Sequence, residues 1–181
     1  HHSPSGDCIF DHQIMAAILG LLKKLPVQLG VSTLIVFGVQ TLVKVTPGTW
    51  YKSIKRPNWT PPNWAFPAVW IPLKLMQSVA LALVMRGASQ GAPVAATAVA
   101  VGVFGVHLAL GNMWNVVFFG QHKLKQSLPV MGAFWLSVAG SAAAFHPVSR
   151  TAAALMLPTL AWVTVAAKLN VDIVNLNTVP N

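Results

Sequence analysis

The sequence predicts an all-α membrane protein: a bundle of five transmembrane helices, with a loop rich in proline and tryptophan between the first and second helices. Two observations lead to this fold class. Of the 181 residues, 55% are hydrophobic and only 8% are charged, whereas about 25% are charged in an average soluble domain. The hydrophobic residues are also gathered into long runs with almost no charge, and about 20 such residues suffice to cross a bilayer as a helix.

The apolar runs follow one another along the chain, separated by short links that contain Gly or Pro. Because backbone N–H and C=O groups in lipid must pair within the protein, such runs fold as helices. Short links place consecutive helices side by side and antiparallel. The five expected helices cover residues 26–43, 65–85, 93–119, 128–145 and 151–174.

These helices divide the chain into three parts. Residues 1–25 are an N-terminal segment in which His1 and His2 resemble a tag remnant, and the stretch "FDHQIMAAILGLLKKL" is expected to form a short amphipathic helix lying on the membrane. Residues 26–177 form the five-helix membrane domain, and residues 178–181 form a C-terminal tail.

The loop before the second helix, "KRPNWTPPNWAFPAVW", is unusual in composition. Its prolines, among them Pro61 and Pro62, fix the backbone φ angle and make the segment stiff. Its tryptophans suit the membrane interface, where an apolar ring and a polar N–H are both satisfied. Two interpretations follow: an aromatic anchor, which we favour for Trp59 and Trp64, or a preformed lid over a cavity between the helices.

The formal net charge is +9, with only three acidic residues. The cations lie between the apolar runs, where they meet lipid phosphates or anionic ligands, so we expect the bilayer and no nucleic acid as a partner. Hydrolase, nucleotide-binding and metalloprotease motifs are missing from the sequence. Paired-carboxylate catalysis has almost no candidates. Composition does not distinguish a bacterial membrane from a mitochondrial, plastid or endoplasmic reticulum membrane.

Lys74 lies well inside the second apolar run. Trp70, Lys74 and Gln77 are spaced i, i+4 and i+7, so they share one helix face. A charge inside a span costs roughly 2.5–3.5 kcal/mol on insertion scales, so it normally faces a cavity or a partner. We expect Lys74 to face a cavity and to suit an anionic ligand; the alternative is that its amine snorkels to the nearer interface.

Two further polar features fall within the spans. His107, midway through the third run, could ligate a haem iron or bind a proton, but more often such a histidine forms a hydrogen bond with a neighbouring helix. Lys168 and Asp172 are four residues apart and are expected to form an ion pair on the helix surface.

A stripe of small residues runs along one face of the third expected helix. Small residues allow two helix backbones to approach closely, either inside the bundle or across a dimer seam. The residues of this candidate seam are Ala98, Gly102, Gly105 and Ala109.

Two stretches, "WYKSIKRPNWTPPNWAFPAVW" (50–70) and "LPTLAWVTVAAKLNVDIVNLN" (157–177), resemble the signature of the tryptophan-rich sensory protein / translocator protein family, also called the peripheral benzodiazepine receptor family. The resemblance covers residues 31–177. It implies a five-helix bundle with a ligand cavity closed by the first loop. It also implies binding of porphyrins such as protoporphyrin and haem, of cholesterol-like lipids, and of isoquinoline or benzodiazepine-type drugs, and it favours a homodimer through the third helix.

The resemblance places Trp50, Trp70 and Trp162 around the ligand, with Pro158 loosening the helix one turn before Trp162. Some family members promote light- or oxidant-dependent porphyrin breakdown. In an enzyme of that kind these three tryptophans would be the redox partners, whereas in a binding protein the tetrapyrrole is a ligand and no cofactor is required. The candidate ligand-binding residues are Trp50, Pro61, Pro62, Trp70, Lys74, Gln77, His107, Trp114, Pro158 and Trp162.

The sequence also departs from the family pattern. Lys74 stands where the family usually has Tyr, His107 replaces Gln, Gly111 replaces Asn, and Thr159 replaces Tyr, while Trp114 is kept. The cholesterol motif of animal members needs a Tyr and a basic residue near the chain end, and "NVDIVNLN" has neither. We therefore expect a protein that senses, scavenges or moves flat hydrophobic ligands, often anionic and chiefly tetrapyrroles.

Overall fold

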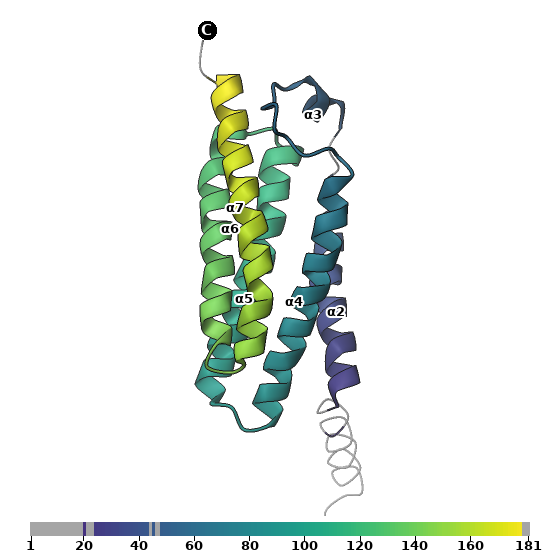
Figure 1. Ribbon diagram of the computed structural model, residues 1–181, viewed down its shortest axis with the longest axis vertical. Helices are drawn as coiled ribbons and strands as arrows, with labels where there is room; N and C mark the ends of the chain where they lie inside the picture. The colour runs from purple at the N-terminus through teal and green to yellow at the C-terminus, as the bar shows by residue number, and fades with distance from the viewer. Residues whose placement is uncertain (1–19, 21–23, 44, 46–47, 179–181) are drawn as a thin grey trace, which may run out of the picture.

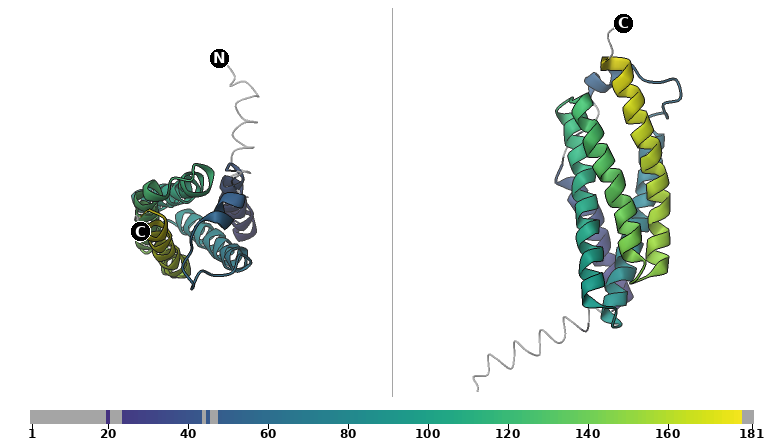
Figure 2. Two further views of the ribbon diagram at one scale, coloured as in Figure 1. Left: turned by 90° about the horizontal axis from the view of Figure 1, so that it is seen from above. Right: turned by 90° about the vertical axis from the view of Figure 1, so that its left-hand side faces the viewer.

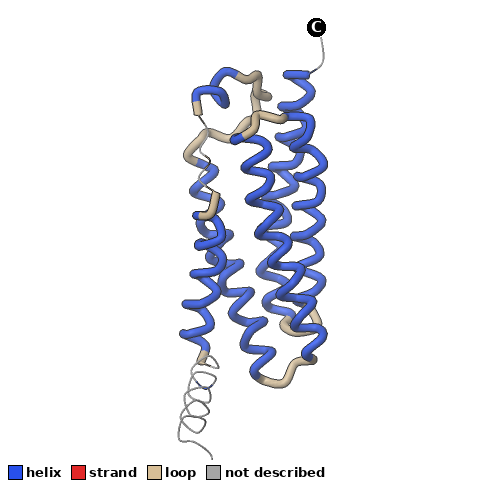
Figure 3. The backbone as a smooth tube through the Cα atoms, turned by 180° about the vertical axis from the view of Figure 1, so that it is seen from behind, coloured by secondary structure: helices blue, strands red, loops and turns tan. Residues whose placement is uncertain are grey.

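The computed structural model describes residues 20, 24–43, 45 and 48–178, and the regular secondary structure of this part of the chain is entirely helical, with no strand (Figure 3). The predicted amphipathic helix before residue 26 lies almost entirely outside the described residues. In chain order the elements are α2 (Leu25–Thr41), α3 (Thr49–Ser53), α4 (Ala65–Ser89), α5 (Val94–Asn115), the π-helix η1 (Val116–Gly120), α6 (Leu124–Phe145) and α7 (Arg150–Thr178).

The long helices run roughly along one axis and pack around one another as a bundle (Figures 1 and 2). Around this bundle α2 packs on α4, α4 on α7, α7 on α6, and α6 on α5. The contact between α5 and α2 is the weakest in this ring. The bundle is therefore closely packed on one side and less so between α2 and α5.

Among the residues that the structure describes, four helical segments are long and apolar enough to cross a membrane: α4, α5 continued by η1 (Val94–Gly120), α6 and α7. This confirms the prediction of an all-helical membrane protein. Helix α2 is also apolar but has 17 residues, which corresponds to about 26 Å, slightly less than the roughly 30 Å of a bilayer core. That α2 is a fifth span stays a prediction.

Helix α3 and the proline-rich loop that follows it lie at the end of the bundle where α7 ends (Figure 1). Helix α3 is held there by aromatic contacts. Tyr51 is buried, with its ring centroid 5.4 Å from that of Phe119. The ring of Trp50 stacks on His122, with centroids 4.1 Å apart and planes 18° apart. Helix α3 therefore packs over η1 and the short link between η1 and α6.

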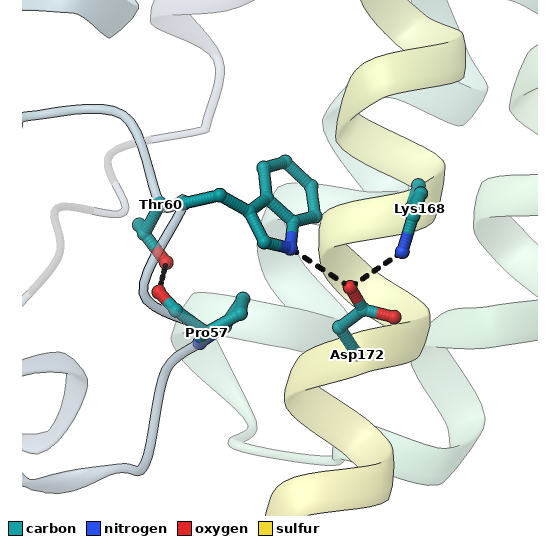
Figure 4. A network of polar contacts seen from close by, with 5 residues as sticks. Pro57, Thr60, Lys168 and Asp172 are labelled. Carbon is teal, nitrogen blue, oxygen red and sulfur yellow. Dashed lines mark hydrogen bonds and ion pairs between the residues drawn. The ribbon is translucent and has the colours of Figure 1, made fainter.

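The proline-rich loop is tied to α7 by two sets of polar contacts. In one of them, drawn in Figure 4, the indole Nε1 of Trp59 donates a hydrogen bond to Oδ2 of Asp172 at 3.0 Å. The amine of Lys168 is 2.7 Å from the same oxygen and lies 5.2 Å from the centroid of the Trp59 ring. The predicted pair of Lys168 and Asp172 is thus confirmed, and it has a partner in the loop that the sequence analysis did not foresee.

The second set of contacts lies one turn and a half further along α7. The side-chain amide of Asn177 donates to the carbonyl of Lys55 at 2.8 Å and accepts from its backbone N–H at 3.0 Å. This two-sided contact reproduces the pairing of a backbone amide, so the loop backbone is held at Lys55 as well as at Trp59. Trp64, by contrast, is 71% exposed, as an interfacial anchor would be.

The stripe of small residues on α5 faces away from the bundle. All four residues are exposed, and a Cβ built on Gly102 or Gly105 meets no atom within 4 Å. The alternative that the stripe packs inside the bundle is therefore wrong. Whether a second copy of the chain covers it stays a prediction.

The contact between Trp59 and Asp172 predicts how firmly the loop is held. Trp59→Phe keeps the ring but removes the donor, and Asp172→Leu removes the acceptor. Each variant should give several-fold faster deuterium exchange in a peptide covering residues 54–64, because one of the two attachments to α7 is lost. Combining the two changes should add little to either one alone. Equal exchange in the wild type and both variants would show that the hydrogen bond does not hold the loop.

Candidate functional site

A cavity lined by helices α2, α4 and α5 lies within the bundle, on the side where α2 and α5 are least closely packed. Its volume is about 360 Å³, within the roughly 300–1,000 Å³ typical of small-molecule sites. Helices α2, α4 and α5 supply most of its wall, and α6 supplies a single residue, Phe134. The part of α2 that faces it is apolar except for Gln40.

Helix α4 brings the expected face to this cavity. Trp70, Lys74 and Gln77 all line it, as residues one and two turns apart on one helix should. Lys74 is half-buried and lies about 14 Å from the start of α4. Among the described lining residues it is the one lysine or arginine, and no Asp or Glu is among them. The cavity is therefore apolar with a single cation in its wall.

Gln77 connects the cavity wall to α7. It is 1% exposed, and its amide Nε2 donates to the hydroxyl of Thr159 at 3.2 Å. The carbonyl oxygen Oε1 of Gln77 has no partner among the described residues. Thr159, which stands where the family usually has Tyr, thus serves as the polar contact of Gln77 on the side away from the cavity.

Helix α5 contributes His107, which is 2% exposed and lines the cavity. Its ring stacks on Phe134, with centroids 5.4 Å apart and planes 12° apart. The more common alternative, a hydrogen bond to a neighbouring helix, is not made by Nδ1, which has no partner among the described residues. Ligation of a haem iron by His107 stays a prediction.

Two side chains near the loop end of α5 fix this wall in place. The amide of Asn112 donates to the carbonyl of Val39 in the last turn of α2 at 2.7 Å. The same carbonyl also accepts a longer hydrogen bond from the backbone N–H of Leu42 at 3.3 Å, so the amide of Asn112 adds a second, shorter bond that ties α5 to α2. Trp114 lines the cavity and donates from Nε1 to Oδ1 of Asn170 on α7 at 2.7 Å.

Five of the candidate residues lie outside this cavity. Trp50 stacks on His122, and Pro61 and Pro62 line a separate groove of about 490 Å³ in the loop, together with Arg56.

The other two candidates outside the cavity are on α7. Pro158 is exposed. Trp162 has its ring centroid 6.2 Å from that of Phe66 at the start of α4, and its indole Nε1 is buried without a partner among the described residues.

The expectation that Trp50, Trp70 and Trp162 line one cavity therefore does not match the structure. Trp70 shares the cavity with Trp114 instead. The physical reason is the order of the helices: α7 packs on the other side of α4, so it contributes no residue to the cavity wall. Whether Trp50 or Trp162 touches a ligand stays a prediction.

Several cavity residues were not identified as such from the sequence, and Gly111 and Phe134 are two of them. Gly111 was noted only as a departure from the family pattern, although it lies one turn after His107 and so shares its face. No pattern in the sequence singles out Phe134, because a phenylalanine on the inner face of a helix is ordinary core. Within the described residues no three His, Cys, Asp or Glu side chains gather as a metal site.

Comparison with known proteins gives a consistent result. The model of the TspO/MBR family matches residues 27–176. The chain is 36% identical to Protein CrtK of Rhodobacter capsulatus over 73% of this chain and 81% of that protein. It is 33% identical to the tryptophan-rich sensory protein of Cereibacter sphaeroides over 72% and 78%, and 30% identical to the human translocator protein over 67% and 70%. The chain is an integral membrane protein and belongs to the TspO/MBR family.

Proposed function

We propose that this protein binds flat hydrophobic ligands that carry an acidic group, chiefly tetrapyrroles such as protoporphyrin or haem, and that it senses, scavenges or transports them. The observation that carries the proposal is the single cation of the cavity, Lys74, set between apolar walls and indole rings. Two relatives are named a tryptophan-rich sensory protein and a translocator protein, and these names support a role in sensing or moving a ligand.

The position of Lys74 argues for an anionic partner. An ammonium group at membrane depth is expensive unless it is paired or hydrated, and no described acidic residue lines the cavity. A ligand carboxylate would supply the missing charge, and charge-assisted hydrogen bonds are stronger than those between neutral groups. A propionate of a tetrapyrrole has this chemistry, whereas a neutral sterol or benzodiazepine-type drug could accept a hydrogen bond from Lys74 but would not neutralise its charge.

The indole rings argue for a planar ligand body. Trp70 and Trp114 come from α4 and α5 and line the same cavity. Offset or edge-to-face contacts of aromatic rings add about 0.5–1.5 kcal/mol beyond the area that they bury. The alternative of a porphyrin-degrading enzyme is less well supported, because only Trp70 of its three expected redox tryptophans lies in the cavity.

We also propose that the exposed small stripe on α5 is a homodimer seam. The stripe leaves room for a second helix backbone at Gly102 and Gly105, and close approach of backbones is the main source of helix association in lipid.

Lys74→Met should weaken protoporphyrin binding by about ten- to a hundredfold, because a charge-assisted hydrogen bond in a partly dehydrated site is worth roughly 1.5–3 kcal/mol. Titration of the purified protein with protoporphyrin and with its dimethyl ester, which lacks the charges, measures the effect. The ester should bind the wild type and the variant alike, and Lys168→Met on the outer face of α7 should bind as the wild type does. Equal losses for acid and ester would exclude a role of the charge.

Trp70→Leu should weaken protoporphyrin roughly two- to tenfold, corresponding to the loss of one aromatic contact. Trp162→Leu is the matched control, since it removes an indole that lies outside the cavity and should leave the dissociation constant within about twofold. Affinity is the proper readout, because quenching of tryptophan fluorescence by a porphyrin does not require contact. A larger loss in Trp162→Leu than in Trp70→Leu would place the ligand on the other side of α4.

Gly102→Leu combined with Gly105→Leu should convert a dimer into a monomer that still binds protoporphyrin, because the new side chains point away from the cavity and fill the space for a second helix. Light scattering of the detergent-solubilised protein, corrected for bound detergent, gives the mass. An unchanged mass would mean that the seam lies elsewhere or that the protein is a monomer.

A further inference from the structure

Four buried rings form a column inside the bundle, beginning at the cavity. In order they are Phe134, His107, Phe104 and Phe145, and each ring centroid is 5.4 Å from the next. None of the four side chains is more than 4% exposed. They come from α6, α5, α5 and α6, so the column fills the space between these two helices over about 16 Å of α6, from Phe134 to Phe145.

The cavity ends where this column begins. Phe134 and His107 line it, whereas Phe104 and Phe145 do not. On the other helices the lining residues furthest from the loop are Val36 on α2 and Gln77 on α4. The wall is thus confined to the part of the bundle nearer the loop, and the rest of the interior is closely packed.

The ring of Phe134, the first in the column, occupies space that is free because Gly111 has no side chain. A Cβ added to Gly111 would lie 3.1 Å from Cε2 and 3.2 Å from Cζ of Phe134, closer than ordinary van der Waals contact. The ring of Phe134 therefore lies across one turn of α5, against His107 and over the bare backbone of Gly111. With any larger residue at this position, the ring could not stay where it is without a shift.

We propose that Phe134, seated on Gly111, is the floor of the ligand cavity and determines how bulky a ligand the cavity accepts. The proposal rests on the ligand-binding function proposed above and deepens it. The ligands favoured are compact planar acids that fit in the cavity on the loop side of Phe134. Ligands that need space beyond Phe134 are excluded by the packed column.

A thiol-labelling experiment tests the floor without assuming any ligand. The native Cys8 is replaced by Ser, and Val138→Cys places a reporter one turn beyond Phe134 on α6, at a position that is 0% exposed. A small methanethiosulfonate should label this cysteine slowly while Phe134 is present. Adding Phe134→Ala should raise the labelling rate at least about tenfold, since the space left by the ring would connect the ligand cavity to the new cysteine.

Phe145→Ala is the matched control, because it removes the same side chain from the far end of the column. It should destabilise the protein by a similar mechanism without opening a path from the cavity. If Phe134→Ala does not fold, Phe134→Leu gives a smaller opening and the same direction of change. The floor is disproved if labelling is unchanged by loss of Phe134, or if Phe145→Ala raises it equally.

A second experiment tests whether this floor selects ligands. Deuteroporphyrin and mesoporphyrin carry the same two acid groups, but mesoporphyrin has two additional ethyl substituents. The ratio of their affinities should move about tenfold toward mesoporphyrin in Phe134→Leu, since a substituent-sized difference in a pocket is worth about 1–3 kcal/mol. Phe145→Leu should leave the ratio as in the wild type.

The two experiments separate this inference from the function on which it rests. An unchanged ratio in Phe134→Leu, or an equal change in Phe145→Leu, would show that Phe134 does not select ligands. If the wild type binds neither porphyrin, the proposed tetrapyrrole function is wrong and so is ligand selection by Phe134, while the labelling result still decides whether Phe134 is the floor.

Discussion

A membrane-spanning chain must turn its polar side chains inward, because lipid offers them no hydrogen bonds, and this constraint places the candidate site. The apolar helices carry few polar residues, and several of those that are buried form hydrogen bonds between helices. Gln77 meets Thr159 between α4 and α7, and Trp114 meets Asn170 between α5 and α7. Lys74 and His107 have no such counterpart and face the cavity. Of these four side chains and their partners, Lys74 and His107 are thus the polar groups available to a ligand in the cavity.

The same constraint explains which parts of the structure could be predicted from the sequence. Helix positions follow from the length and polarity of the apolar runs, and the shared face of Trp70, Lys74 and Gln77 follows from helical spacing alone. Membership of the cavity beyond a single helix does not follow in this way. Trp162 was expected around the same ligand as Trp70, but it lies beside Phe66 because α7 packs on α4, and spacing along one helix contains no information on which helices are neighbours.

Phe134 shows more clearly why cavity residues on different helices could not be predicted from the sequence. Its ring occupies space that Gly111 leaves free on a different helix, so its position is set by a pair of residues that no periodicity connects. The loop gives a similar case: Asp172 was correctly paired with Lys168, but its bond to Trp59 joins residues far apart in the chain. Contacts between helices that are both apolar have to be seen in three dimensions, because their sequences differ too little to specify the partner.

The bond between Asn112 and the carbonyl of Val39 has a consequence for how the protein is made. Helix α2 precedes α4 and α5 in the chain, so it is synthesised before either of these neighbours. The carbonyl of Val39 in its last turn has a local backbone partner in Leu42, but its shorter bond comes from Asn112, which follows 73 residues later. Until α5 arrives, α2 can rest only on α4, and the wall between α2 and α5 does not exist. The cavity is therefore completed only after α5 has been made. Loss of the Asn112 amide should weaken the packing of α5 on α2 in the newly made chain, before any ligand is present.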